Sequence, residues 1–170
     1  FSGGEPLLQP VFLGRLLREC KRREIHTAVD TTCHAPWEVI EAINPSVDLY
    51  LADLKHMDPA SHERLTGARN DLIHENLRRL ARIARQIIIR IPIIPGANDS
   101  EENVAASGRF VAGLGGIARV DLLPYNEAVR GKLARLVRPY EPFDGERAAP
   151  ERIEAIARRL EEFGFTVKIP

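Results

Sequence analysis

Cysteine is scarce in this 170-residue chain, which contains only Cys20 and Cys33. Two cysteines in a chain of this length do not indicate a disulfide scaffold, so we expect reduced thiols in a reducing compartment. No apolar run approaches the length needed to cross a bilayer, and the sequence shows no signal-peptide pattern. These absences predict a cytoplasmic protein that has no membrane partner.

Net charge is absent as well, because 24 Lys and Arg residues balance 24 Asp and Glu residues. A balanced charge gives no general electrostatic attraction to nucleic acid, so we expect no nucleic-acid partner. Internal repeats and low-complexity tracts are also missing. With 44% hydrophobic and 28% charged residues, the composition is typical of a soluble globular protein, and we expect one domain over residues 1–170.

Helical and strand patterns alternate along the sequence, which indicates an α/β fold with a parallel sheet. Short apolar or β-branched runs predict strands at 27–31, 48–54, 86–94, 120–125 and 165–169. Amphipathic spacing predicts helices at 9–21, 36–43, 59–65, 72–85, 101–114 and 150–163. The isoleucine-rich run at 86–94 predicts a central strand covered on both faces. Residues 126–149 show no clear periodicity.

Polar residues lie at or near the C-terminal ends of the predicted strands. They are Glu5, Asp30, Asp53, Lys55, Arg90, Asn98 and Asn126. The active site of a β/α barrel assembles at this face, because the loops that follow the strands meet there. Consecutive βαβ units would place Asp30 and Asp53 on neighbouring strands, where their like charges should raise one pKa. Arg90 stands inside an isoleucine-rich strand, so its guanidinium should be paired.

Several of these residues also have a purely structural interpretation. Asp30 could cap the turn into the next helix, and Asp53 could form a simple ion pair with Lys55 on the same face of a strand. The five histidines share no helix face at i, i+4 spacing, although His34 and His56 follow strand ends. A metal-dependent barrel hydrolase or lyase using Asp30, His34, Asp53 and His56 is a second hypothesis for the function. A noncatalytic domain of the same fold is a third.

Five segments resemble the radical S-adenosylmethionine enzymes in their order and spacing. They are Gly3-Gly4-Glu5-Pro6, Val29-Asp30-Thr31-Thr32, Leu51-Ala52-Asp53-Leu54-Lys55, the stretch from Ile89-Arg90 to Asn98-Asp99, and Leu122-Leu123-Pro124-Tyr125-Asn126. The sequence is most similar to the activating enzymes of glycyl radical enzymes, of the pyruvate formate-lyase activating type. The resemblance implies a partial (β/α)6 barrel of the TIM type, with the N-terminal strands and the cluster loop missing from this chain.

The resemblance also implies a reaction. A [4Fe-4S] cluster would cleave S-adenosylmethionine reductively, and the enzyme would take a hydrogen atom from a glycine of a partner glycyl radical enzyme, with a flavodoxin or ferredoxin as reductant. The family holds this cluster on three cysteines spaced Cys-x3-Cys-x2-Cys, and Cys20 and Cys33 do not match that spacing. We therefore expect this chain to be the C-terminal part of such an enzyme, without a cluster, without catalytic residues and inactive by itself.

A set of cofactor-binding residues follows from the same resemblance. They are Gly3, Gly4, Glu5, Asp30, Asp53, Lys55, Arg90 and Asn126. The glycine turn would meet the methionyl amine, the acidic strand ends would surround the methionyl and ribose part, and Arg90 would lie near the carboxylate and ribose. Segments 95–96 and 123–126 would flank the adenine, although Asn126 stands where a histidine is common. A monovalent cation would be bound by Asp30, Thr31, Asp53 and the backbone carbonyl of Leu51.

Overall fold

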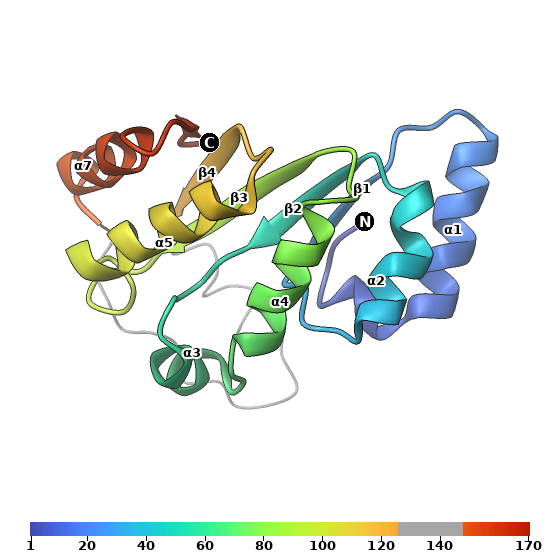
Figure 1. The fold of residues 1–170 in the computed structure, drawn as a ribbon, viewed down its shortest axis with the longest axis horizontal. Helices are drawn as coiled ribbons and strands as arrows, with labels where there is room; N and C mark the ends of the chain where they lie inside the picture. Colours follow the sequence, from blue (N-terminus) through green and yellow to red (C-terminus); the bar gives the residue numbers. More distant parts are fainter. Residues whose placement is uncertain (126–147) are drawn as a thin grey trace.

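One parallel sheet of five strands forms the centre of the molecule (Figure 1). The computed structural model describes residues 1–125 and 148–170. The strand order is β1 (Ala28–Thr31), β2 (Leu49–Asp53), β3 (Ile87–Ile93), β4 (Arg119–Pro124) and β5 (Thr166–Lys168). Each strand therefore pairs with its neighbour in the sequence, as expected for successive βαβ units. The predicted α/β fold with a parallel sheet is confirmed, and β3 is its central strand.

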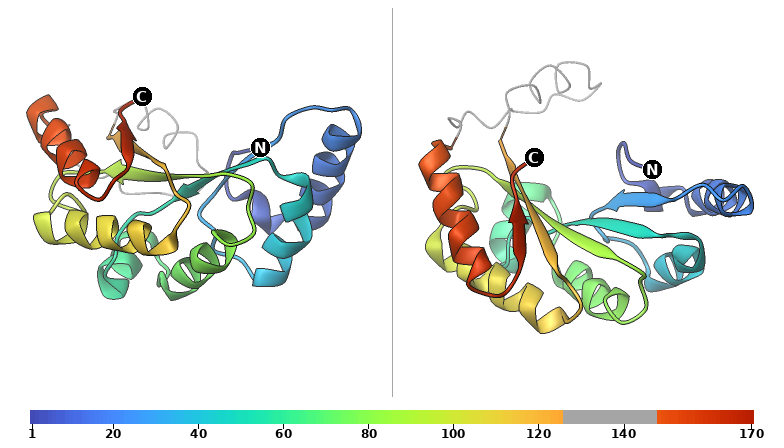
Figure 2. Two further views of the ribbon diagram at one scale, coloured as in Figure 1. Left: turned by 45° about the horizontal axis from the view of Figure 1, so that its top comes forward. Right: turned by 90° about the horizontal axis from the view of Figure 1, so that it is seen from above.

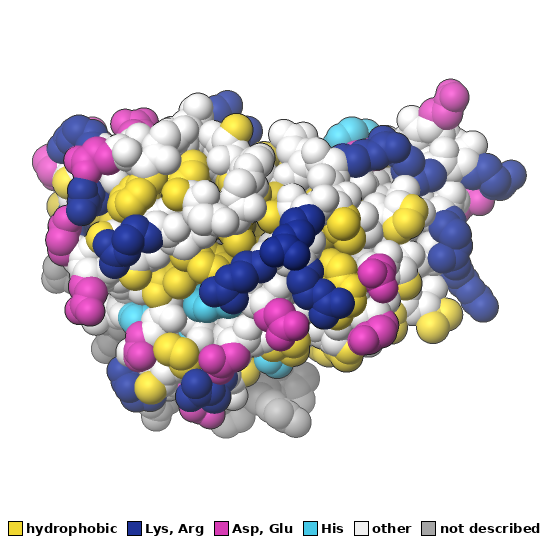
Figure 3. Space-filling model, in the orientation of Figure 1, with side chains coloured by type: hydrophobic (Ala, Val, Ile, Leu, Met, Phe, Trp, Pro, Cys, Tyr) yellow, Lys and Arg dark blue, Asp and Glu magenta, His cyan; other side chains and the backbone are white. Residues whose placement is uncertain are grey.

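Helices cover the convex face of the curved sheet, as in part of a barrel wall (Figure 2). They are α1 (Pro10–Arg22), α2 (Trp37–Ile43), α3 (Pro59–Thr66), α4 (Asp71–Leu80), α5 (Glu101–Leu114) and α7 (Pro150–Glu161), with short 3-10 turns at Pro6–Leu8 and Asn44–Ser46. Lys, Arg, Asp and Glu side chains are interspersed over the surface of this helix layer (Figure 3). Among the described helices, none has the length and apolar character that a membrane span requires.

The core lies between the sheet and these helices. Its fully buried side chains include Leu17, Val29, Ile40, Tyr50, Leu77, Ile89, Leu122 and Leu160. Burying one Leu or Ile side chain contributes about 1.5–3 kcal/mol relative to its exposure, so the apolar stripes of the helices fix their positions on the sheet. In β1 and β2 the residues alternate between buried side chains and partly exposed ones. The partly exposed set lies on the concave face.

The predicted elements agree with the structure except at their ends. The helix expected at 72–85 ends at Leu80, and the next residues form tighter turns in which the amide of Ile83 donates to the carbonyl of Leu80 at 3.0 Å. The N-cap of α5 is Ser100, whose side chain accepts from the amide of Asn103 at 3.2 Å. Coverage of β3 on both faces is incomplete, because Arg90 and Pro92 are partly exposed.

The outer edge of β1 is paired with the first residue of the chain. The amino group of Phe1 donates to the carbonyl of Ala28 at 2.5 Å, and the carbonyl of Phe1 accepts from the amide of Asp30 at 2.9 Å. Gly3 and Gly4 then turn the backbone with φ values of 93° and 62°, which glycine adopts without steric cost. This turn delivers Glu5 to the C-terminal end of β1.

Candidate functional site

Two aspartates and an arginine meet on the concave face, at the C-terminal ends of β1, β2 and β3. The strand register sets Asp30 beside Leu51 and Asp53 beside Arg90, which places all these side chains on one face. Nη2 of Arg90 lies 2.9 Å from Oδ1 of Asp30 and 3.1 Å from Oδ1 of Asp53. The predicted convergence of the two aspartates and the predicted pairing of Arg90 are confirmed.

Lys55 completes this charged group, since its Nζ lies 3.0 Å from Oδ2 of Asp53. The side chain of Asp53 is 17% exposed and that of Lys55 is 33% exposed, so the group is open to solvent on one side. Burial raises the pKa of Asp30, Arg90 acts to lower it, and the charge of Asp53 raises it further. The repulsion predicted from the sequence is present, but desolvation of the carboxyl is the larger cause.

The carboxylate of Glu5 anchors the glycine turn to the end of β1. Its Oε1 accepts from the hydroxyl of Thr31 at 2.7 Å and from the amide of Leu7 at 3.1 Å. Its Oε2 accepts from the amide of Thr32 at 2.9 Å and from the hydroxyl of the same residue at 2.6 Å. Glu5 therefore has a structural role here, and the exposed part of the turn is the backbone of residues 3–4. Its contact with a methionyl amine stays a prediction.

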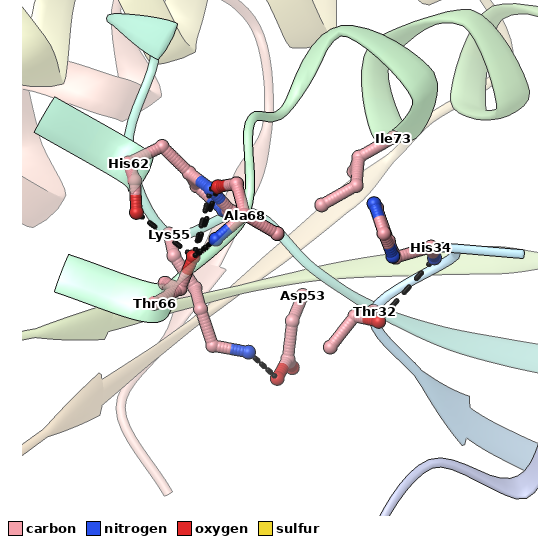
Figure 4. A pocket seen from close by; sticks show the side chains of 8 residues that line it. All are labelled: Thr32, His34, Asp53, Lys55, His62, Thr66, Ala68 and Ile73. Atoms are coloured by element: carbon pink, nitrogen blue, oxygen red, sulfur yellow. Dashed lines mark hydrogen bonds and ion pairs between the residues drawn. The ribbon is translucent and has the colours of Figure 1, made fainter. Parts of the chain in front are cut away.

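A pocket of about 180 Å³ opens beside the charged group (Figure 4). It is lined by Thr32, His34, Asp53, Lys55, His62, Thr66, Ala68 and Ile73. One wall comes from the ends of β1 and β2, and the other comes from α3 and the residues that follow it. Nδ1 of His62 lies 2.6 Å from the carbonyl of Ala68 and ties the second wall together. The pocket thus lies at the strand ends where barrel enzymes bind their ligands.

Buried asparagines hold the loops that follow the strands, a role that was not predicted from the sequence. Nδ2 of Asn76 donates to the carbonyls of Cys33 and Ala35, both at 2.8 Å. The signal was available for this residue, because Asn76 is a polar residue on the apolar face of α4. Asn98, which the sequence places among the polar residues at strand ends, is buried between the ends of β2 and β3.

The histidines do not support the hypothesis of a metal-dependent hydrolase or lyase. His34 lines the pocket beside Asp53, but His56 lines a different hollow together with Ser100 and Glu102. Nδ1 of His56 accepts from the amide of Asp58 at 3.0 Å. Within residues 1–125 and 148–170, no group of three His, Cys, Asp or Glu side chains is arranged to hold a metal ion. The four-residue metal site is therefore not formed.

The remaining predicted residues belong to the expected cation site and to the segments expected to flank an adenine. The hydroxyl of Thr31 donates to Glu5 and its side chain is buried on the helix side of β1, away from Asp30, while Arg90 lies between the two aspartates. The monovalent-cation site stays a prediction. The amide of Tyr125 donates to the carbonyl of Ile93 at 3.0 Å, so β4 stays paired with β3 up to the residues just before the turn at 95–96. Asn126 itself lies outside the described residues.

Comparison with known proteins identifies the family. The family model of the radical SAM superfamily matches residues 1–107. The chain belongs to the radical SAM superfamily. A crystal structure of a domain of pyruvate-formate lyase-activating enzyme from Bacteroides vulgatus is 33% identical to it, with a TM-score of 0.84 over 100% of this chain and 96% of that one. The resemblance found in the sequence is confirmed.

Curated relatives within this superfamily are activating enzymes. The (2S)-3-sulfopropanediol dehydratase activating enzyme of Klebsiella oxytoca is 38% identical over 82% of this chain and 45% of its own length. The trans-4-hydroxy-L-proline dehydratase activating enzyme of Clostridioides difficile is 36% identical over 99% of this chain and 56% of its own length. The chain spans about half the length of the curated relatives it matches.

The superfamily implies S-adenosylmethionine and a [4Fe-4S] cluster, and this chain suits the first but not the second. The methionyl part of S-adenosylmethionine carries an ammonium and a carboxylate, and the site offers both carboxylates and cations at a partly exposed edge. A cluster is held by several cysteine thiolates. Cys33 is completely buried, burial raises the pKa of its thiol, and Cys20 lies on α1. These two residues do not form a cluster site.

Proposed function

We propose that this chain is the S-adenosylmethionine-binding part of a glycyl radical enzyme activating enzyme. The observation that carries the proposal is the group of two carboxylates and two cations at the C-terminal edge of a radical SAM sheet. The group contains both charges that a zwitterionic methionyl ligand needs. The likeness to a solved domain of an activating enzyme supports the same assignment.

Each member of the group has a proposed role toward the ligand. Asp30 and Asp53 accept hydrogen bonds from the ligand's ammonium and from its ribose hydroxyls, while Arg90 and Lys55 pair with its carboxylate. The backbone of the turn at residues 3–4 contributes further polar groups, and residues 95–96 and 123–126 flank the adenine. Binding exchanges ion pairs within the protein for ion pairs with the ligand, so little charge is left unpaired. A monovalent cation near Asp30 and Asp53 is a further part of the proposal.

The whole protein would use this site in a radical reaction. A [4Fe-4S] cluster, on ligands that this chain does not contain, would supply the reductive cleavage of S-adenosylmethionine. The protein substrate would be a glycyl radical enzyme, which loses a hydrogen atom from one glycine, and a flavodoxin or ferredoxin would act as reductant. The site described here contributes binding and orientation, and the cofactors supply the difficult chemistry. The reaction would take place in the cytoplasm.

Calorimetric titration tests the proposal. The chain is titrated with S-adenosylmethionine and, separately, with 5′-methylthioadenosine, which has the nucleoside but lacks the amino acid part. We expect saturable one-to-one binding of S-adenosylmethionine and weaker binding of 5′-methylthioadenosine by at least about tenfold, because the second ligand forms no ion pair with the charged group. Absence of S-adenosylmethionine binding would overturn the proposal. Equal affinity for the two ligands would show that the charged group does not bind the amino acid part of S-adenosylmethionine.

A further inference from the structure

The pairing between β2 and β3 ends at a proline. The amide of Leu54 donates to the carbonyl of Arg90 at 2.9 Å, which is a normal rung of a parallel ladder. The next amide of β3 that faces β2 would belong to residue 92. Pro92 has no N–H to donate to the carbonyl of Leu54, so this rung cannot form and the pairing stops here. The carbonyl of Pro92 points to the same side, beyond the end of β2 at Asp53, and therefore needs a donor from elsewhere. The gap lies immediately beside the pair formed by Asp53 and Arg90.

Asn98 fills this gap with its side chain. Its Nδ2 donates to the carbonyl of Pro92 at 2.6 Å and to the carbonyl of Lys55 at 2.8 Å. Its Oδ1 accepts from the amide of Ile94 at 2.8 Å. The residue is only 3% exposed, so these bonds form away from competing water. One amide group therefore joins the backbone that carries Lys55 to the end of β3.

Two further buried asparagines extend this connection. Nδ2 of Asn103 donates to the carbonyl of Asn98 at 2.7 Å, and its Oδ1 accepts from the amide of Met57 at 2.9 Å. Nδ2 of Asn70 donates to the carbonyls of His56 and Met57, at 2.7 Å and 3.0 Å. The three successive residues 55–57 are thus held by asparagine side chains. A loop held in this way presents the Lys55 ammonium in one place.

We propose that Asn98 is a positioning residue for the S-adenosylmethionine site, acting through Lys55. The inference rests on the proposed function of the charged group. Asn98 contacts main-chain atoms of both segments that follow the pair, Lys55 after Asp53 and residues 92–94 after Arg90. It does not need to contact the ligand. It sets the distance between the backbone of Lys55 and the end of β3, and so keeps the ammonium against Asp53. Its removal releases Lys55 without removing any charge from the site.

A double-mutant cycle separates positioning from a general structural role. The affinity for S-adenosylmethionine is measured for wild type, Asn98→Ala, Lys55→Met and the double variant. We expect Asn98→Ala to weaken binding about tenfold. Because Asn98 acts through Lys55, the double variant should bind as weakly as Lys55→Met alone. Additive effects in the double variant, or unchanged affinity in Asn98→Ala, would overturn the proposal.

Thr27→Val is the matched control for loss of stability. Thr27 is 1% exposed at the other end of β1, and its hydroxyl donates to the carbonyl of Ser46 at 2.8 Å. This variant should lose stability and keep its affinity for S-adenosylmethionine within about twofold of wild type, since it lies away from the charged group. If Thr27→Val weakens binding as much as Asn98→Ala, the effect of Asn98 is general destabilisation and the proposal is wrong.

Amide hydrogen exchange without ligand gives a second readout. In Asn98→Ala, the amide of Ile94 and those of residues 55–58 should exchange faster than in wild type, while the amides of β1 keep their rates. Should Asn98→Ala fail to fold, Asn98→Ser keeps one donor and should show a smaller change in the same amides. If wild type binds no S-adenosylmethionine, the proposed function fails, and exchange still reports whether Asn98 holds the loop. Unchanged exchange in residues 55–58 would overturn the positioning role.

Discussion

The two ends of the sheet use their carboxylates in different ways. At the N-terminal end, Asp48 accepts from Nζ of Lys21 at 2.7 Å and from the amide of Thr27 at 2.9 Å, and it also contacts Arg85 at 3.1 Å. The hydrogen bond from Lys21 is the largest cause that lowers the pKa of Asp48. At the C-terminal end, burial raises the pKa of Asp30, whose ionic partner among the described residues is Arg90.

This difference separates a structural role from a binding role. The ionised form of Asp48 is stabilised by the fold itself, which is what a stabilising contact at the lower face of a barrel provides. Asp30 is partly buried and shares the guanidinium of Arg90 with Asp53, and a perturbed carboxyl in that position is typical of a functional site. The comparison predicts that changes at the C-terminal end alter ligand binding, and that changes at the N-terminal end alter stability.

The largest effect is expected at Asp53. We predict that Asp53→Asn weakens the binding of S-adenosylmethionine by about 1–3 kcal/mol, because the ligand loses an ionised acceptor at a partly buried position. The melting temperature of the empty protein should change little, because relief of the repulsion with Asp30 offsets the loss of the ion pairs to Arg90 and Lys55. Calorimetric titrations and thermal melts of both proteins measure the two effects. Unchanged affinity in Asp53→Asn would show that this carboxylate does not bind the ligand.

Asp48→Asn is the counterpart at the N-terminal end. We predict a melting temperature several degrees below that of wild type at pH 7, because Lys21 and Arg85 lose their ionised partner. Since the folded-state pKa of Asp48 is lowered, its contribution is present above the unfolded pKa and is lost as the pH falls through the folded pKa. The two melting temperatures should therefore converge in acid. The affinity for S-adenosylmethionine should change less than twofold, and a tenfold loss would contradict the separation of the two ends.

The helix layer gives a third point of comparison, at His74. This residue is 9% exposed, and the centroid of its ring lies 4.6 Å from that of Phe110. Its Nε2 has no hydrogen-bond partner among the described residues. Burial, followed by the charge of Arg78, lowers the pKa of His74 to about 4. The unfolded chain binds a proton near pH 6.5 and the folded chain does not, so stability is complete above that pH and falls as the pH drops toward 4.

His74→Gln tests this pH dependence. Between pH 6.5 and 4, wild type should lose about 1–2 kcal/mol more stability than the variant, after allowance for solvent screening at the ring. Chemical denaturation at a series of pH values measures the difference. Parallel pH profiles for the two proteins would show that His74 is not buried in its neutral form.

The sequence predicted the order of elements well because the periodicity of apolar residues reports burial directly. The expected helix at 72–85 was too long, since Ile83 continues the apolar spacing after the backbone has left the helix at Leu80. Convergence of Asp30 and Asp53 followed from the order of the strands. The four hydrogen bonds to Glu5 could not be predicted from the order of the strands, because they depend on where two separate turns meet.

Asn98 shows why the position of a residue could be predicted while its role could not. Read locally, residues 98–100 offer three capping side chains, and only the structure shows that Ser100 is the cap. The requirement for Asn98 arises where β2 and β3 part, because its side chain supplies the donors for the carbonyls of Pro92 and Lys55. A proline inside an otherwise apolar central strand was the available signal, because such a residue marks the point where pairing with the neighbouring strand stops.

The most direct test of the account is a titration of the isotopically labelled chain with S-adenosylmethionine, followed by amide chemical shifts in nuclear magnetic resonance spectra. The account predicts that shifts concentrate at the C-terminal ends of β1, β2 and β3, at residues 30–32, 53–55 and 90–96. Amides around Thr27, Asp48 and Arg85 should not move. Shifts centred on the N-terminal end of the sheet, or an unchanged spectrum at saturating ligand, would contradict the assignment of the C-terminal edge as the binding site.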